Sequence, residues 1–513
     1  MRLKLVAGMT AAIVLAPATP AHAQAPFSAG IELDVVVETV LARSPDIERG
    51  RLAVEAEAGA RLLAASPFDL QVRAGLSSAR ETVPLAGASN GLLVTGSVET
   101  SASAVKSFRA GMVVSSALSL GRVRTGAVGL PVDQIGASVS LLVPLAGGRG
   151  GGAAAGAERA ARESYAASRL ERDHVTAQAV HDAVQAYWVY LAAHEQLSTY
   201  IESADRARRL VEETEALIRA DERPLSDLDL MSSNLAQKQT AVTAARQTLL
   251  DAQYVLGIAM GLAANAVSAL GPPLTPFPEA GRDSRVAATA AMRIQMVRTA
   301  LSTRRDLAAV RARRAGARLA WEGAVRDVRP RWDVLARIGY AGVSQRPASG
   351  AASAFPRSTG GANGLVQIQY EPVANNRAVQ GRARRTAALE QAAAVAADDL
   401  GRRIEANVRA AIEGLDNAAR EALAAREAVR LSERSVVTEQ EKFRLGLATL
   451  FDAILAEDSL TNARLRETSA QLRFAAALVR LRFETATLVE TVAGAVSVDP
   501  GRMTSFAFEE RKP

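Results

Sequence analysis

Two long runs of regularly spaced apolar residues meet at a short interruption, and this pattern limits what the chain can fold into more than any other. The first run extends from Ile404 to Phe443 and the second from Ala453 to Leu481. Apolar residues at steps of three and four give a helix one apolar stripe, as in coiled coils. Between the runs, Gly446 can end one helix and Thr449 can cap the next. The stretch therefore predicts two long, packed helices joined by a tight turn.

A weaker copy of this helical hairpin lies in the first half of the chain. The apolar periodicity predicts a long helix at 153–221 and a shorter one at 225–262, with Pro224 in the turn between them. The second half has the corresponding helices at 376–445 and 449–491. A helix of about 70 residues is about 105 Å long. Both halves therefore predict an elongated helical body.

Strand-like alternation of apolar and polar residues occurs at four places, two in each half of the chain. The predicted strands are at about 67–80, 133–145, 330–343 and 364–373. Alternation places polar and apolar side chains on opposite faces of a sheet. The polar positions of interest are Gln71, Arg73, Gln367, Gln369 and Glu371. The segment 84–132, rich in Gly, Ser and Ala, is interpreted as a surface loop or β-extension.

These elements divide the chain into two copies of one plan. The first repeat covers 24–264, a proline-rich linker covers 265–284, the second repeat covers 285–492, and a tail covers 493–513. The predicted fold class is mainly α with a small β portion, built from duplicated long-helix hairpins. The first 23 residues have two basic residues, an apolar run and Ala21-His22-Ala23, which is typical of a secretory signal peptide.

Composition excludes several function classes. The chain has no cysteine, so it has no disulfide, thiolate metal site or cysteine nucleophile. Its formal charge of +7 is mild for 513 residues, and we expect no nucleic-acid partner. His174 and His181 are too far apart for metal ligands on adjacent helical turns, and no catalytic constellation is visible. We therefore expect neither an enzyme nor a cofactor or metal.

The second turn carries a family resemblance. The segment FRLGLATLFDAILAEDSLTNAR, residues 443–464, resembles the second helical hairpin of the TolC-like outer-membrane efflux proteins, also called outer membrane factors. The resemblance implies a homotrimer whose helices form an α-barrel topped by one shared, 12-stranded transmembrane β-barrel. Four strands from one chain are too few to close a barrel, which agrees with pooling of strands among subunits.

The same resemblance implies a function and its partners. The channel would lie in the cell outer membrane, contact outer-membrane lipid and extend into the periplasm. There it would meet a periplasmic adaptor (membrane fusion) protein and an inner-membrane pump, and act as a passive conduit in tripartite efflux or type I secretion. The transported substrate and the energy source of the pump stay open, and a secreted or surface coiled-coil structural protein or adhesin is the alternative.

Three sets of residues are candidates for the work of such a channel. The adaptor-contacting set at the hairpin turns is Leu445, Gly446, Leu447, Thr449, Asp452, Pro224, Leu225 and Ser226. The charges that could hold a gate are Arg434, Glu439, Glu457 and Asp458, with ion pairs expected between the two arms of the second hairpin. The five polar strand positions given above would face the barrel lumen, with the apolar positions of the same strands in lipid.

Overall fold

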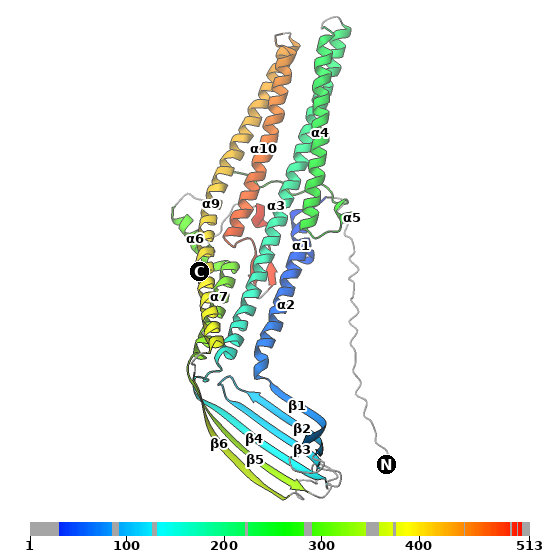
Figure 1. Cartoon of the computed structure of the whole chain (residues 1–513). Coiled ribbons are helices and arrows are strands. Elements are labelled where there is room, and N and C mark those ends of the chain that lie inside the picture. Colours follow the sequence, from blue (N-terminus) through cyan, green and yellow to red (C-terminus); the bar gives the residue numbers. More distant parts are fainter. Residues whose placement is uncertain are drawn as a thin grey trace.

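The protein is a tall stack of helices with one curved sheet at its end (Figure 1). The computed structural model describes residues 30–84, 92–125, 131–220, 224–281, 290–344, 359–372, 376–445, 447–492, 495–499 and 501–504. The signal-peptide prediction for 1–23 lies outside the described residues. We refer to the two ends of the molecule as the sheet end and the hairpin end.

Four long helices form two hairpins. The first hairpin consists of α3 (Gly152–Arg219) and α4 (Ser226–Ala259), and the second of α9 (Arg377–Arg444) and α10 (Leu450–Glu484). α3 and α9 both have 68 residues, which corresponds to about 100 Å each. The predicted helix at 449–491 is too long at its end, because α10 stops at Glu484 and Ala486 takes a positive φ of 55°. That backbone conformation is incompatible with a continuing helix.

Two broken helices complete the body. α1 (Leu33–Arg43) and α2 (Pro45–Ala65) are separated at Ser44, and α6 (Ala290–Thr303) and α7 (Arg305–Arg326) are separated at Arg304. Ser44 is extended because a residue before proline avoids the helical region. Arg304 has nearly the same backbone angles without a proline. Among the described residues, no helix is both long and apolar enough to cross a membrane.

Six antiparallel strands form one sheet in chain order. They are β1 (Leu70–Pro84), β2 (Leu92–Ser107), β3 (Val113–Thr125), β4 (Val132–Ala146), β5 (Arg331–Ser344) and β6 (Thr359–Glu371). The expectation of four strands per chain is therefore wrong, because part of the segment 84–132 forms the hairpin β2–β3 between β1 and β4. Its small residues weaken the alternation that marks a strand. Twelve strands would consequently not result from three copies of this sheet.

Short elements complete the structure. The 3₁₀ turn η2 (Ser66–Phe68) precedes β1, and α5 (Ala264–Val267) follows α4. β7 (Glu490–Val492), at the end of the predicted second repeat, pairs with β8 (Ala495–Ser497) of the predicted tail, and α11 (Gly501–Thr504) follows. Met503 of α11 is fully buried.

The glycine run after β4 is a defined turn rather than a flexible joint. Gly147 and Gly152 both have positive φ, and a Cβ at Gly152 would collide with the carboxylate of Asp327 at the end of α7. The same carboxylate accepts a hydrogen bond from the backbone N–H of Ala153 at 3.1 Å. Asp327 thus caps α3 and holds the start of that helix against the end of α7.

The main core lies midway along the helices. Trp188 and Tyr187 of α3 are fully buried with Val36 of α1, Leu256 of α4 and Val479 of α10. A second cluster packs α6, α7, α9 and α10 around Ile404 and Leu415, which belong to the heptad pattern. Helical order beside the sheet is α2, α3, α7 and α9, each packed on the next. The apolar stripes therefore build the side-by-side body that carries the sheet.

Candidate functional site

The turn of the second hairpin is closed by a capping box. Thr449 Oγ1 accepts a hydrogen bond from the backbone N–H of Asp452 at 3.2 Å, and the Asp452 carboxylate accepts one from the backbone N–H of Thr449 at 2.9 Å. These bonds satisfy N–H groups that the first helical turn would leave unpaired. The hydrogen bond donated by the Thr449 hydroxyl lowers the pKa of Asp452. Both residues therefore fix the start of α10.

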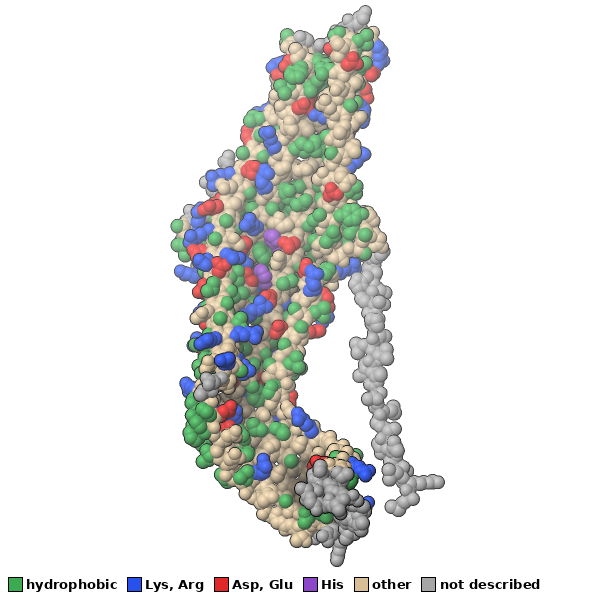
Figure 2. Space-filling model, viewed as in Figure 1, with side chains coloured by type: hydrophobic (Ala, Val, Ile, Leu, Met, Phe, Trp, Pro, Cys, Tyr) green, Lys and Arg blue, Asp and Glu red, His purple; other side chains and the backbone are tan. Residues whose placement is uncertain are grey.

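Apolar side chains lie exposed around this cap. Leu445 is 71% exposed, Leu447 is 75% exposed and Phe451 is 62% exposed. Leu455 follows one turn later and is also exposed. Hydrophobic side chains are visible among charged ones at this end of the molecule (Figure 2). Large exposed apolar side chains gathered in one place are typical of a surface that another molecule covers. Gly446, the remaining member of the predicted set in this turn, lies outside the described residues.

The first hairpin ends differently. Pro224, Leu225 and Ser226 are all exposed, but Leu225 stands at the cap position and provides no side-chain hydrogen bond to α4. Residues 221–223 lie outside the described residues. Among the described residues, Leu225 and Leu230 are the exposed large apolar side chains at this end of α4, which is fewer than around the second turn. The two turns are therefore not equivalent as contact surfaces.

Glu457 and Asp458 join the two hairpins to each other. Glu457 of α10 is 6% exposed, and its carboxylate accepts hydrogen bonds from Arg206 Nε of α3 at 2.6 Å and from Gln440 Nε2 of α9 at 2.8 Å. Asp458 pairs with Lys238 of α4. One turn of α10 is consequently held to both helices of the first hairpin. We call Arg206, Lys238, Glu457 and Asp458 the inter-hairpin ion pairs.

The expected ion pairs within the second hairpin are not the ones formed. Glu439 pairs with Lys442, its neighbour on α9, at 2.7 Å, and Arg434 lies on the exposed side of α9. Glu457 faces Arg206 instead because α10 packs on α3 as well as on α9. Arg206 and Lys238 were not predicted as site residues. The charge pattern of one helix does not indicate an ion-pair partner more than 200 residues away in the chain.

A buried apolar cluster also joins the two hairpins. Towards the hairpin end, Leu210 and Met231 of the first hairpin pack with Phe443, Leu450 and Ala453 of the second. Phe451 and Leu455 are four residues apart and share the exposed face of α10. These two were not among the predicted contact residues. The sequence signal that could have identified them is that both are large apolar residues outside the buried positions of α10.

The sheet separates polar from apolar side chains along its whole width. Cross-strand partners lie on the same face, so the pairing register assigns each residue to a face. One row of partners across the sheet is Val72, Ala104, Ser116, Val139, Ile338 and Gly364. The next row, on the opposite face, is Arg73, Ser103, Ala117, Ser138, Gly339 and Asn363. The first face is mainly apolar, and the second holds most of the polar side chains together with Leu142, Leu335 and Leu365.

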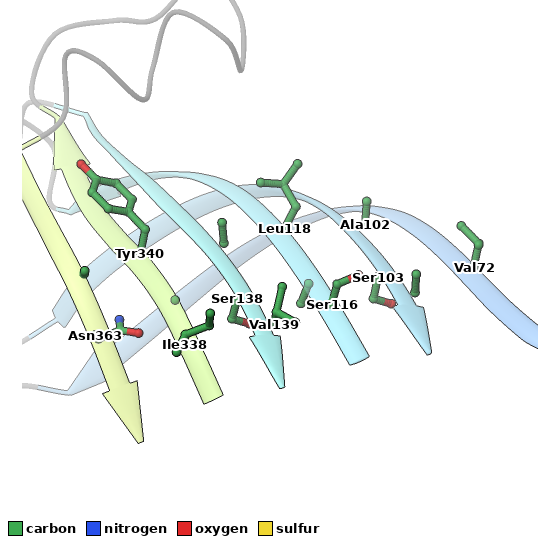
Figure 3. A pocket seen from close by; sticks show the side chains of 15 residues that line it. Val72, Ala102, Ser103, Ser116, Leu118, Ser138, Val139, Ile338, Tyr340 and Asn363 are labelled. Atoms are coloured by element: carbon green, nitrogen blue, oxygen red, sulfur yellow. The ribbon is translucent and has the colours of Figure 1, made fainter. Parts of the chain in front are cut away.

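The five polar strand residues predicted to share a face do so. Gln71 and Arg73 of β1 belong to the polar face, and the register places Gln367, Gln369 and Glu371 of β6 on that same face. The apolar face exposes Val72, Ile338, Val366 and Ile368. The sheet also has a shallow hollow of about 710 Å³ whose lining comes from all six strands (Figure 3).

A buried ionic cluster stands at the break between α6 and α7. Arg304 donates to Asp306 at 3.0 and 2.7 Å and to Glu484 of α10. Burial acts to raise the pKa of Asp306, but the hydrogen bonds and positive charge of Arg304, together with His174 and the backbone N–H of Leu307, leave that pKa below its usual value. Burial lowers the pKa of His174, which stacks on Phe483 at 5.6 Å, against the opposing effect of Asp306. This cluster explains the second helix break without a proline.

Two tall hairpins joined by ion pairs and a six-stranded sheet with two contrasting faces make up the architecture of this chain. Several solved structures share it. The CmeC outer membrane channel of Campylobacter jejuni is 14% identical, with a TM-score of 0.67, over 89% of this chain and 85% of that one. The outer membrane protein VceC of Vibrio cholerae is 15% identical, with a TM-score of 0.65, over 88% of this chain and 95% of that one.

CusC, whose structures concern folding and transmembrane channel formation, is 14% identical over 90% of this chain and 93% of its own, with a TM-score of 0.67. No protein-family model and no curated protein matches the sequence. The resemblance to the TolC-like channels is therefore confirmed at the level of the fold. This chain has the fold of those channels across nearly its whole length.

Proposed function

We propose that this protein is the outer-membrane channel of a tripartite efflux or type I secretion system. It acts as a passive conduit from an inner-membrane pump and its periplasmic adaptor to the exterior. The observation that carries the proposal is the sheet. An apolar face running across six strands, joined to helices about 100 Å long, suits a wall that meets lipid on one side and water on the other.

The chain works as a homotrimer in the cell outer membrane. The sheet contributes part of a shared transmembrane barrel, with outer-membrane lipid against the apolar face and water against Gln71, Arg73, Gln367, Gln369 and Glu371. The helices extend into the periplasm and enclose the same duct. A secreted coiled-coil rod or adhesin has no use for an exposed apolar sheet face, which favours the channel over that alternative.

The second hairpin turn is the docking surface for the adaptor. Leu445, Leu447 and Phe451 are costly to leave in water and become covered when an adaptor hairpin meets them. Thr449 and Asp452 contribute indirectly, because their capping box holds these side chains in place. Pro224, Leu225 and Ser226 form a second, weaker contact on the other hairpin.

The inter-hairpin ion pairs hold the duct closed. Opening the hairpin end requires one hairpin to move relative to the other, and the Arg206–Glu457 and Lys238–Asp458 pairs resist that movement. Arg206 and Glu457 are both mostly buried, and so is Lys238 in the other pair, so salt screens these pairs less than it screens pairs on the surface. Arg434 and Glu439 have no part in this closure.

The proposal is tested by location, assembly and transport measured together. The mature protein should fractionate with the outer membrane, and native mass spectrometry in mild detergent should give three chains. Leu447→Asp should keep both properties but abolish site-specific crosslinks from position 447 to the adaptor, and transport should fall. Leu431→Asp, at an exposed residue of α9 far from the turn, is the matched control. Recovery in the soluble periplasm, or unchanged transport in Leu447→Asp, would overturn the assignment.

A further inference from the structure

The hairpin β2–β3 is an integral part of the sheet rather than an attachment to it. β2 pairs with β1 from Leu92 to Lys106, and β3 pairs with β4 from Val113 to Val123. Thus the hairpin separates β1 from β4 along almost their full lengths. Four strands would suffice to connect α2, α3, α7 and α9, so β2 and β3 are needed by none of these helices.

The turn of this hairpin is fastened to the helical body. Arg109 donates two hydrogen bonds to Glu158 of α3, both at 2.7 Å, and Glu158 is only 3% exposed. The backbone N–H of Gly150 donates to the carbonyl of Ala110 at 3.0 Å. Lys106 Nζ donates to the carbonyl of Phe68 at 2.6 Å. A buried carboxylate with two charged hydrogen bonds holds the turn in one position.

The two faces of the sheet continue through the hairpin. On the polar face it contributes Ser101, Ser103, Ser115 and Ser119, and Ser115 bonds to Ser140 of β4 at 2.6 Å between their hydroxyl oxygens. On the other face its side chains include Ala102, Ala104, Val114, Leu118 and Leu120. An insertion that lay outside the wall would not need to match both faces of its neighbours.

The outer strands of the sheet fit a second copy of the same chain. Within the described residues, β1 and β6 each pair on one side only. β1 leads away from the helices and β6 leads back to them, so β6 of a neighbouring copy beside β1 keeps every strand antiparallel. Their lengths of 15 and 13 residues also match. Joining these edges satisfies backbone groups that lipid cannot.

We propose that the exit pore is walled by six strands from each chain, eighteen in the trimer, and that the β2–β3 hairpin widens it with a sector lined by serine hydroxyls. The inference rests on the proposed trimeric channel. With strands about 4.8 Å apart and tilted by about 40°, eighteen strands give a backbone diameter of roughly 36 Å, and twelve give roughly 24 Å. The pore therefore accepts bulkier solutes than a twelve-stranded wall would.

The widths of the sheet and of the helical layer support this count. Four helices side by side, at about 9 Å each, are about 36 Å wide. Six tilted strands are about 37 Å wide, whereas four are only about 25 Å wide. The six-stranded sheet thus continues the helical wall at nearly constant width.

The absence of cysteine makes a direct distance measurement possible. Val139→Cys places a single spin label on the apolar face of β4 in each chain. Pulsed electron–electron double resonance on the purified trimer then measures the distance between the labels of two chains. Labels on a ring are about 0.87 diameters apart in a trimer, so eighteen strands give roughly 31 Å and twelve give roughly 21 Å before label lengths are added. Deleting 92–125 should shorten the distance by about 10 Å.

Leu431→Cys on α9 is the control, because its distance should not change when the hairpin is deleted. If the deletion variant fails to assemble, the distance in full-length Val139→Cys still distinguishes an eighteen-stranded wall from a twelve-stranded one. A trimer with the shorter distance overturns the eighteen-stranded wall and leaves the channel assignment intact. A mass of two chains overturns both the trimer and this wall, since two sheets supply only twelve strands.

Discussion

Removing the Glu457 carboxylate is the sharpest test of closure by the inter-hairpin ion pairs. Glu457→Ala removes two hydrogen bonds, from Arg206 and Gln440, and leaves Arg206 largely buried. Orphaning one partner of a buried ion pair costs about 3–5 kcal/mol. Arg206 keeps a second, partly exposed partner in Glu202 at 3.6 Å, so we expect the lower end, about 3 kcal/mol.

That energy is expected to shift the balance between closed and open duct. A loss of about 3 kcal/mol from the closed state alone raises the open-to-closed ratio roughly 100-fold. Single-channel recordings of purified trimers in planar bilayers measure this ratio as open probability. Glu457→Gln should have a smaller effect, because its amide oxygen still accepts a hydrogen bond while its charge is gone.

Glu441→Ala is the matched control on the same hairpin. Glu441 pairs with Arg444 at 3.4 Å, with both side chains well exposed, and exposed pairs contribute little. Open probability should therefore stay at the wild-type value. If Glu457→Ala also leaves it unchanged while the trimer stays intact, the hairpins do not open by breaking this ion pair, and the reasoning is refuted.

Three further predictions concern the sheet, the helix break and the hairpin turn. Val366→Arg should weaken assembly by about 2–4 kcal/mol if the residue lies near mid-bilayer, whereas Gln367→Arg on the polar face should be mild, as measured by trimer yield in detergent. Burial lowers the pKa of His174 in the folded state, so the contribution of this side chain to stability is complete above the unfolded pKa of 6.5 and falls as the pH drops below it. His174→Phe should therefore make the melting temperature depend less on pH between pH 6.5 and 5. An unchanged dependence on pH would count against this role. Thr449→Val should speed hydrogen exchange at the start of α10 without changing exchange in β4, and equal rates there would show that the cap is unimportant.

Much of the helical body could be predicted because its determinants are local. The heptad from Ile404 to Phe443 shows one apolar stripe whatever lies beside it, and the structure buries Ile404, Val408 and Leu415 of that stripe. Pro45 likewise forces an extended residue before it in any context. The cap at the start of α10 could be predicted for the same reason, since Thr449 and Asp452 are only three residues apart.

The sequence indicated a surface loop or β-extension at 84–132, but it did not predict that the hairpin β2–β3 forms part of the sheet, because these strands carry weak signals. The polar face of the hairpin carries Ser101, Ser103, Ser115 and Ser119, and β2 carries Ala102 and Ala104 on the opposite face; neither serine nor alanine favours a strand by itself. Those residues become a strand because β1 and β4 supply backbone partners on both sides. The pairing extends from Leu92 to Thr125, and no local pattern contains it.

The sequence alone determined the lengths and amphipathic character of the helices, the position of their breaks and the alternation of four strands, because each depends on residues close together in the chain. The tertiary structure decided what those elements meet. Glu457 faces Arg206, 251 residues away, only because α10 packs beside α3. The number of strands in the sheet was likewise fixed by pairing, since a small, polar segment forms a strand when its backbone N–H and C=O groups find partners and otherwise stays in water.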